Sequence, residues 1–251
     1  MPSSVFLRVL GSGDPFGSGG RNQSAYLLEA GGMRILLDCG AAAVASLKKL
    51  GVDTGGIDLV LLSHFHGDHV AGLPFLFHDY QHATLRRSPV LVAGPRGARR
   101  RIEAIYRVLF PRAGARRRRF RVDYRVLREG RPFRPPGGPG ARIVPFRVRH
   151  ASAGGGFGYI LDLLGRRLVY SGDTGWFDGL ARAARGADLF LCECTHGAEG
   201  AGGHLGLAEM EARRPGIAAR RILLTHLGPA FAGRRKAGGF ELARDGMRIR
   251  V

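Results

Sequence analysis

The chain has 251 residues, enough for a substantial core, and because no linker-like stretch divides it we expect one domain over residues 1–251. No apolar stretch approaches the roughly eighteen residues of a membrane span, the first residues lack the layout of a secretory signal, and three cysteines do not make a disulfide framework. These features exclude membrane-spanning and disulfide-stapled classes and predict a cytoplasmic protein, whose formal net charge of +19 would attract polyanions.

Apolar runs of strand length recur along the chain and alternate with helix-compatible stretches. We expect strands at residues 5–10, 25–30, 33–37, 57–62, 89–93, 120–127, 142–148, 157–163, 166–170, 187–193 and 220–224. Residues 40–50 and 97–110 have the apolar spacing of helices, and residues 26–37 form a glycine-turned hairpin. This alternation predicts an α/β protein with mixed sheets. The D-G turn within residues 241–251 predicts a closing hairpin.

Histidines and aspartates follow five of these strands directly. The segment SHFHGDH, residues 63–69, places three histidines and an aspartate after the apolar run 57–62. The residues that follow the five strands are Asp38, His64, His150, Asp173 and His226. Because the carboxyl ends of strands in open α/β sheets collect ligands at one edge, we expect these side chains to meet.

The residue types predict a pair of metal sites. Neutral imidazoles and carboxylates suit zinc, or manganese or iron, with about four ligands for each ion. One predicted site consists of His64, His66, His150 and Asp173, and the other of Asp68, His69, His226 and a shared Asp173. Two such ions about 3.5 to 4 Å apart lower the pKa of a bridging water and hold both the attacking and the leaving oxygen of a hydrolysed ester. We assign Asp38 to orienting the histidine loop through hydrogen bonds rather than to the ions themselves.

Arginine is concentrated in residues 96–134, which hold fifteen arginines and three acidic residues. Such a segment would attract a phosphate-bearing substrate by counterion release, and we take Arg116, Arg117, Arg118 and Arg119 as its candidate substrate contacts. The alternative is codon bias, because only three of the 39 basic residues are lysines and 40 glycines accompany them.

Several motifs together resemble the metallo-β-lactamase superfamily over residues 5–228. They are ILLDCG (35–40), SHFHGDH (63–69), His150, SGDT (171–174) and LLTHLG (223–228). The resemblance implies a four-layer αββα sandwich of two mixed sheets, with a dinuclear zinc or manganese site at one edge. Within that superfamily the opening residues and the metal loop resemble the ribonuclease Z and phosphodiesterase branch most.

The segment LCECTHGAEGAGGHLG, residues 191–206, resembles a further motif of that branch. Glu193 falls on the glutamate of its His-Glu-Ala-Thr motif and His204 on its general-acid histidine. A cleaved phosphodiester leaves an alkoxide that needs a proton, which a histidine held by a carboxylate can donate at neutral pH. The candidate catalytic residues are therefore Asp68, His204 and Glu193, with His196 as an alternative donor.

The chain also departs from the branch. Cys192 replaces the histidine of the glutamate motif, and HLG, residues 226–228, stands where His-Ser-Thr is usual. Only 22 residues separate His150 from Asp173, which leaves no room there for the long arm that many ribonuclease Z enzymes use to hold transfer RNA. The resemblance therefore supports a phosphodiesterase more than a tRNA-maturing enzyme.

Three functions remain open at this point. The leading one is a dinuclear metal-dependent phosphodiesterase acting on RNA ends or on a small cyclic or linear phosphodiester. A lactonase or thioesterase could use the same metal site, although it has no evident use for the positive charge. The third hypothesis is not an enzyme but a nucleic-acid-binding module with a non-catalytic metal site. The resemblance further suggests a homodimer, and no membrane partner is expected.

Overall fold

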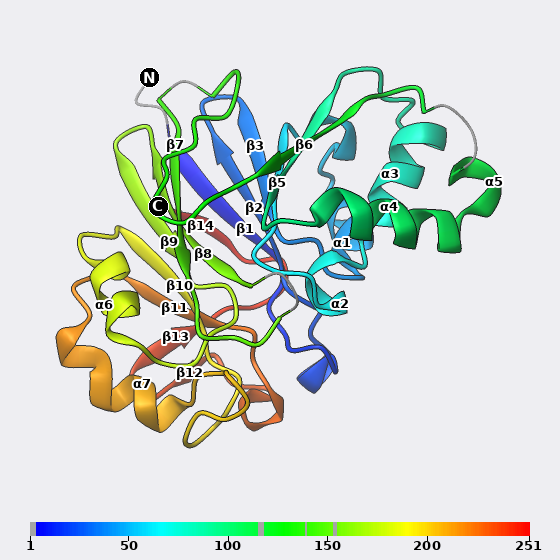
Figure 1. The fold of residues 1–251 in the computed structure, drawn as a ribbon. Helices are drawn as coiled ribbons and strands as arrows, with labels where there is room; N and C mark the ends of the chain where they lie inside the picture. The colour runs from blue at the N-terminus through cyan, green and yellow to red at the C-terminus, as the bar shows by residue number, and fades with distance from the viewer. Residues whose placement is uncertain (1–3, 115–117, 139, 153–154) are drawn as a thin grey trace.

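Two β-sheets lie face to face, with helices on their outer sides (Figure 1). The computed structural model describes residues 4–114, 118–138, 140–152 and 155–251. Within these residues each sheet has seven strands. The first sheet has the order β14 (Arg248–Arg250), β1 (Val5–Gly11), β2 (Ala25–Ala30), β3 (Met33–Leu37), β4 (Leu59–Leu61), β5 (Val90–Gly94) and β6 (Val122–Val126). The second has the order β12 (Lys236–Ala237), β13 (Phe240–Leu242), β11 (Ile222–Thr225), β10 (Leu189–Glu193), β9 (Arg166–Tyr170), β8 (Phe157–Leu163) and β7 (Arg142–Arg147).

Both sheets are mixed, as the sequence predicts. Strands β3 to β6 are parallel to one another, and so are β9, β10, β11 and β13, whereas β1 to β3 and β7 to β9 are joined antiparallel. Parallel neighbours end at the same edge of their sheet, so the loops after β3, β4 and β5 lie together, and so do those after β9, β10 and β11. This arrangement brings distant parts of the chain to one edge of the sandwich.

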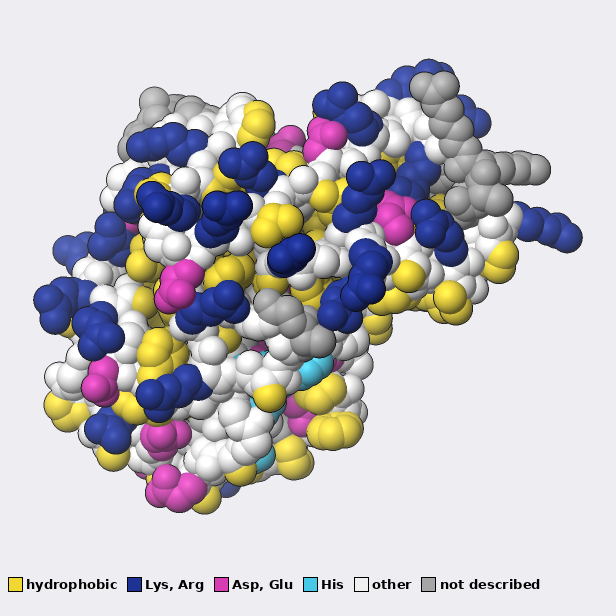
Figure 2. Space-filling view, viewed as in Figure 1, with side chains coloured by type: hydrophobic (Ala, Val, Ile, Leu, Met, Phe, Trp, Pro, Cys, Tyr) yellow, Lys and Arg dark blue, Asp and Glu magenta, His cyan; other side chains and the backbone are white. Residues whose placement is uncertain are grey.

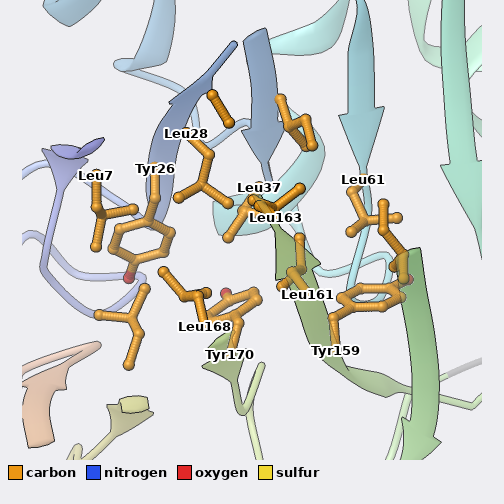
Figure 3. Packing of buried hydrophobic residues seen from close by; sticks show 14 of the residues in the cluster. Leu7, Tyr26, Leu28, Leu37, Leu61, Tyr159, Leu161, Leu163, Leu168 and Tyr170 are labelled. Carbon is orange, nitrogen blue, oxygen red and sulfur yellow. The ribbon is translucent and has the colours of Figure 1, made fainter. Parts of the chain in front are cut away.

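The inner faces of the sheets form the main core (Figure 3). Alternate side chains of β1, such as Leu7, and of β2, such as Tyr26 and Leu28, pack against Leu168 and Tyr170 of β9. The Tyr26 and Tyr170 rings lie 5.4 Å apart, centroid to centroid. Their hydroxyl groups find polar partners at the sheet edge, which ties the core to the residues described below.

Helices cover the outer faces and complete the αββα order of layers. The helices are α1 (Ala43–Lys49), α2 (Gly67–Val70), α3 (Leu73–His82), α4 (Ala98–Leu109), α5 (Pro111–Gly114), α6 (Asp178–Ala184) and α7 (Leu207–Arg213). Helices α1, α3 and α4 lie over the first sheet, and α6 and α7 lie over the second (Figure 1). Their buried side chains pack on these sheets. The expected helices at 40–50 and 97–110 correspond to α1 and α4, and the expected four-layer sandwich is confirmed. No helix in the described part of the chain is long and apolar enough to cross a membrane.

The prediction of a closing hairpin is wrong. Strand β13 pairs with β11 and β12 in the second sheet, whereas β14 pairs with β1 in the first. Asp245, between these strands, accepts hydrogen bonds from the backbone N–H groups of Ser12 and Asn22. The turn residues are therefore bonded to the first sheet, and the chain crosses from one sheet to the other instead of folding back.

Candidate metal centre

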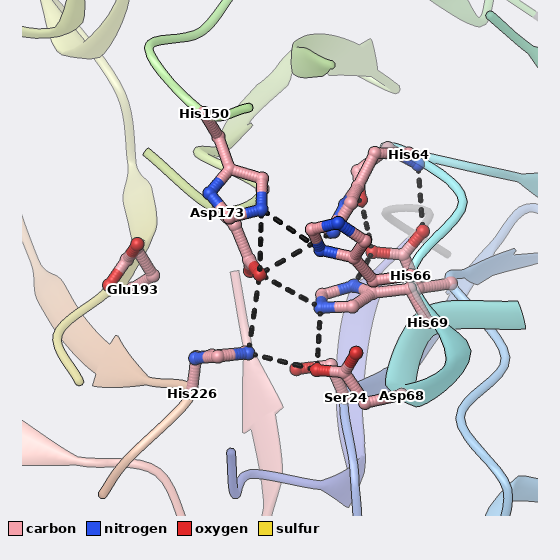
Figure 4. Close-up of polar contacts among 12 residues, drawn as sticks. Ser24, His64, His66, Asp68, His69, His150, Asp173, Glu193 and His226 are labelled. Carbon is pink, nitrogen blue, oxygen red and sulfur yellow. Dashed lines mark hydrogen bonds and ion pairs between the residues drawn. The ribbon is translucent and has the colours of Figure 1, made fainter. Parts of the chain in front are cut away.

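The predicted ligands meet at the edge where strands of both sheets end (Figure 4). The first sheet contributes the loop after β4 and the helix α2 that follows it. The second sheet contributes the loops after β7, β9 and β11. The seven predicted ligands brought together in this way are His64, His66, Asp68, His69, His150, Asp173 and His226.

Asp173 lies between two groups of these side chains. Among the described residues, one group with ligand atoms within 4.8 Å of one another consists of His64, His66, His150 and Asp173, and a second consists of Asp68, His69, Asp173 and His226. Oδ2 of Asp173 lies 3.6 Å from Nε2 of His64 and 3.3 Å from Nε2 of His226. These are the two sets expected from the sequence, with the same shared carboxylate.

The site has the chemistry that a pair of divalent cations requires. Nε2 of His64 and Nε2 of His69 are buried and have no hydrogen-bond partner among the described residues. Buried polar atoms normally have such partners, and both of these nitrogens face Asp173. Imidazole nitrogens and carboxylate oxygens that converge in this way, with the buried Nε2 atoms of His64 and His69 left without a hydrogen bond, fit zinc or a similar ion.

Neighbouring charges set the protonation of the site. Burial, reinforced by the nearby His69, lowers the pKa of His64 to about 2, which leaves a free lone pair on this ring. Burial alone would raise the pKa of Asp173, but His226 and His69 outweigh it and hold that pKa well below its usual range. Burial would lower the pKa of His226, because His226 is a base rather than an acid. The charge of Asp173 and a hydrogen bond to Asp68 outweigh this effect and raise the pKa of His226 to about 9. The carboxylates that favour positive charge on His226 would favour a divalent cation in the same way.

Asp38 is bonded as an orienting residue would be. Its Oδ2 accepts hydrogen bonds from Nδ1 of His69 at 2.8 Å, from the Ser63 hydroxyl at 2.7 Å and from the Tyr170 hydroxyl at 2.6 Å. Its Oδ1 accepts one from the backbone N–H of Ser63 at 2.7 Å. A carboxylate in this position fixes the His69 ring with Nε2 turned toward Asp173.

Other residues position the histidines without having been predicted. The hydroxyl groups of Ser63 and Thr195 lie 3.0 Å from Nδ1 of His64 and 2.8 Å from Nδ1 of His226, respectively. The carbonyl oxygen of Gly203 lies 3.2 Å from Nδ1 of His150. Ser63 could have been found from its place at the start of the histidine loop, whereas Thr195 and Gly203 reach the site only through the fold.

Two site residues have left-handed backbone conformations. Asp38 has φ 53° and His226 has φ 54°, and each is the first residue after its strand. Such conformations cost about 1–3 kcal/mol outside glycine and are concentrated at functional sites. At these two positions the turn at the end of the strand directs the side chain into the cluster.

Replacing Asp38 by asparagine is expected to weaken zinc binding about 10- to 100-fold while leaving some zinc-dependent activity, because the amide cannot accept all the hydrogen bonds that orient His69 and Ser63. Competition with a chromophoric chelator measures the zinc affinity. Asp79→Asn, which changes a buried carboxylate on α3, is the matched control. Full zinc occupancy and full activity in Asp38→Asn would show that the orienting role is wrong.

His204 forms a pair with Glu193 next to the ligand cluster. Nδ1 of His204 lies 2.8 Å from Oε1 of Glu193, and its ring stacks on that of His226 with centroids 5.2 Å apart. Glu193 is buried and also accepts a hydrogen bond from the backbone N–H of Thr174. Burial would lower the pKa of His204, but the hydrogen bond to Glu193 outweighs it and raises that pKa. A ring held in this way presents Nε2 as a proton donor near neutral pH.

His196, the alternative donor, is less well placed. Its side chain is half-buried, and its Nε2 lies 3.3 Å from the carbonyl oxygen of Ala201. Its ring centroid is 6.3 Å from that of His204, which stands between the loop and the ligands. The geometry therefore favours His204.

The structure describes two of the four arginines that were predicted to contact substrate. Arg116 and Arg117 lie outside the described residues. Arg118 donates two hydrogen bonds to Glu103, at 2.7 and 2.8 Å, and its guanidinium lies 4.4 Å from the centroid of the Tyr106 ring. Its charge is therefore used within the fold, which corrects the expectation for this residue. Arg119 has an exposed side chain, and its backbone N–H donates to Gln81.

The chain is similar to known proteins along nearly its whole length. The model of the beta-lactamase superfamily domain matches residues 33–227. An uncharacterized protein of Mycobacterium leprae, ML1173, is 35% identical over 234 residues, which cover 90% of this chain and 78% of that protein. A ribonuclease Z of Bradyrhizobium diazoefficiens is 28% identical and covers 88% of this chain and 89% of its own length.

Solved structures have the same fold. The metallo-beta-lactamase fold protein YhfI of Bacillus subtilis aligns over 99% of this chain and 100% of its own, with a TM-score of 0.77 and 21% identity. The short form of human tRNase Z aligns over 97% of this chain and 98% of its own, with a TM-score of 0.76 and 24% identity. With the family match and the clustered histidines and aspartates, the chain belongs to the metallo-β-lactamase superfamily, in its ribonuclease Z-like branch.

Proposed function

We propose that this protein is a dinuclear metal-dependent hydrolase of the phosphodiesterase type and that residues 1–251 act as one domain. The observation that carries the proposal is Asp173, a buried carboxylate shared by two groups of histidines, with the His204 and Glu193 pair beside them. The core that joins the two sheets draws on residues from Val5 to Ile249, which supports a single domain.

The two groups that share Asp173 would hold the ions. When bound, two divalent ions would supply an activated water at neutral pH and positive charge beside the phosphoryl oxygens. Zinc is the ion we favour because nitrogen and carboxylate ligands suit it, and one solved structure with this fold is the Zn(2+)-bound PqqB of Methylobacterium extorquens.

His204, held by Glu193, would supply the proton that the reaction needs. Cleavage of an alkyl phosphodiester leaves an alkoxide, which departs readily only when it is protonated. Nε2 of His204 would donate this proton, and Glu193 holds the ring through Nδ1 and stabilises its charged form. Oδ2 of Asp68 lies within hydrogen-bond distance of Nε2 of His226, at 3.1 Å, and so keeps the His226 ring in the ligand cluster.

RNA ends are the substrate that we favour among phosphodiesters. Similar proteins that cover most of this chain are ribonuclease Z enzymes, and the net charge of +19 favours a polyanion. We further propose a cytoplasmic protein, in keeping with three buried free cysteines, and a homodimer, in keeping with the exposed apolar side chains of Phe75 and Val108 on α3 and α4.

A panel of three substrates tests the function. We expect the zinc-loaded protein to hydrolyse bis(p-nitrophenyl) phosphate, to lose this activity when a chelator removes the metal and to regain it when zinc is added back. A simple lactone and a thioester, assayed at the same protein concentration with the same chelated controls, should turn over more slowly. Turnover of the lactone or the thioester alone would contradict the phosphodiesterase assignment and place the protein among hydrolases of small esters.

A further inference from the structure

A groove lined by arginine lies between helix α4 and strand β6. It consists of two adjoining cavities of about 490 and 570 Å³ that share the walls formed by Tyr124, Arg125 and Val126. We call this the arginine groove and define it by the seven arginines that line it. They are Arg96, Arg99, Arg100, Arg107, Arg125, Arg128 and Arg131.

The positive charges of the arginine groove are not balanced by the protein. The side chains of all seven arginines are exposed, and none forms a hydrogen bond or an ion pair with another residue in the part of the chain that the structure describes. The one carboxylate in the lining, Glu103, is already bound by both terminal nitrogens of Arg118. Guanidinium groups gathered in a cavity repel one another and create a strong positive potential that an anion would relieve.

The strand register brings the lining of the arginine groove to the same sheet edge as the metal centre. Leu61 of β4 pairs with Ala93 of β5, and Gly94 of β5 pairs with Val126 of β6, so these three strands end at the same sheet edge. The histidine loop follows β4, and the lining of the groove begins after β5 and at the end of β6.

A contact between helix α4 and the histidine loop connects the two features directly. The guanidinium of Arg101 lies 5.2 Å from the centroid of the Phe65 ring, and Phe65 stands between His64 and His66. The backbone N–H of Arg101 bonds to the carbonyl oxygen of Gly97, which lines the groove. Figure 2 shows dark blue side chains over α4 and β6, as well as over other parts of this face, and cyan histidines on the same face of the molecule.

We infer that the arginine groove binds the phosphodiester backbone of a single-stranded RNA whose end enters the metal centre. The inference rests on the proposed function, since it names the substrate of that same site. Guanidinium groups bind phosphates through paired hydrogen bonds. Each cavity has the size of a small-ligand pocket, so two adjoining cavities could hold successive nucleotides of one strand. Tyr124 and Phe133 in the lining add aromatic surfaces of the kind on which bases stack.

The triple variant Arg99→Gln/Arg100→Gln/Arg125→Gln tests the inference. Fluorescence anisotropy measures the binding of a short fluorescein-labelled single-stranded RNA to the zinc-loaded protein at several salt concentrations, with a gel to show that the RNA stays intact. We expect the affinity for RNA to fall by about tenfold or more. The slope of log K against log salt is negative, and its magnitude should become smaller by about two, because each lost phosphate contact removes about 0.7 from the slope for a single strand. The variant Arg128→Gln/Arg131→Gln, in the cavity of about 570 Å³, should reduce the magnitude of the slope by about 1.4.

A control variant removes the same charge elsewhere. Arg182, Arg185 and Arg250 are exposed and form no ion pair with other described residues. The first two belong to α6 and its end, on the second sheet, and Arg250 lies on β14, at the edge of the first sheet opposite β6. Arg182→Gln/Arg185→Gln/Arg250→Gln should change the RNA affinity and the slope much less than the groove variant.

The outcomes separate the inference from the proposed function. Equal losses of RNA affinity in the groove and control variants would overturn the inference, because binding would then depend on net charge alone. Equally tight binding of poly-glutamate would overturn it as well, since the groove would not recognise phosphate. A selective loss in the groove variant supports the inference even if the wild-type protein fails to hydrolyse bis(p-nitrophenyl) phosphate, a result that would contradict only the proposed function.

Discussion

Replacement of Asp173 by asparagine is expected to lower kcat by about a thousandfold or more, because the metal ions contribute several kcal/mol of transition-state stabilisation and this carboxylate is shared by both ligand groups. An amide of the same size keeps the packing but removes the negative charge that lies within 4.0 Å of four histidine nitrogens. The protein should retain less than its full complement of two ions. Mass spectrometry of the bound metal, together with kinetics on bis(p-nitrophenyl) phosphate, measures both effects.

Asp79→Asn is again the matched control for this variant. Asp79 is a buried carboxylate that pairs with Lys48 and Thr54 away from the ligand cluster, so its loss tests for a general effect of removing a buried charge. We expect it to lower thermal stability but to leave the metal content unchanged. If Asp173→Asn kept both ions and its activity, the assignment of a shared ligand would be wrong.

His204→Ala is expected to lower kcat about 10²- to 10⁴-fold on an RNA substrate, the range for losing a general acid. The loss should be much smaller on bis(p-nitrophenyl) phosphate, because p-nitrophenolate is a stable anion that departs without a proton. The ratio of the two losses therefore separates proton donation from a structural role, which would affect both substrates alike. Steady-state kinetics on the two substrates under the same conditions measure it.

His196→Ala provides the control for His204→Ala. The two histidines lie on the same loop, but only His204 contacts Glu193 and stacks on His226. We expect His196→Ala to have close to wild-type kcat on both substrates. If His196→Ala instead reproduced the leaving-group dependence and His204→Ala did not, His196 would be the donor and Glu193 would have a purely structural role.

The metal loop could be predicted from the sequence because its information is local. The histidines and the aspartate of residues 63–69 follow an apolar strand directly, and a strand of a parallel sheet delivers the next residues to its carboxyl edge. The same reasoning located Asp38, His150, Asp173 and His226, each just beyond a strand whose apolar pattern is evident. The hairpin over residues 26–37 followed from its glycine turn in the same way.

Only the tertiary structure decided which charges are free and which strands pair across long distances. Arg118 and Arg125 look alike in the sequence, yet Arg118 is bound to Glu103 while Arg125 lines the groove, because the packing of α4 against β6 places one carboxylate within reach of one guanidinium. The hairpin expected at the C-terminus failed because Asp245 is held by backbone N–H groups of residues 12 and 22, far away in the chain. The sequence alone determined the ligand types and their strand ends, since these follow from local pattern, whereas pairing of charges and of edge strands depends on contacts between residues that only folding brings together.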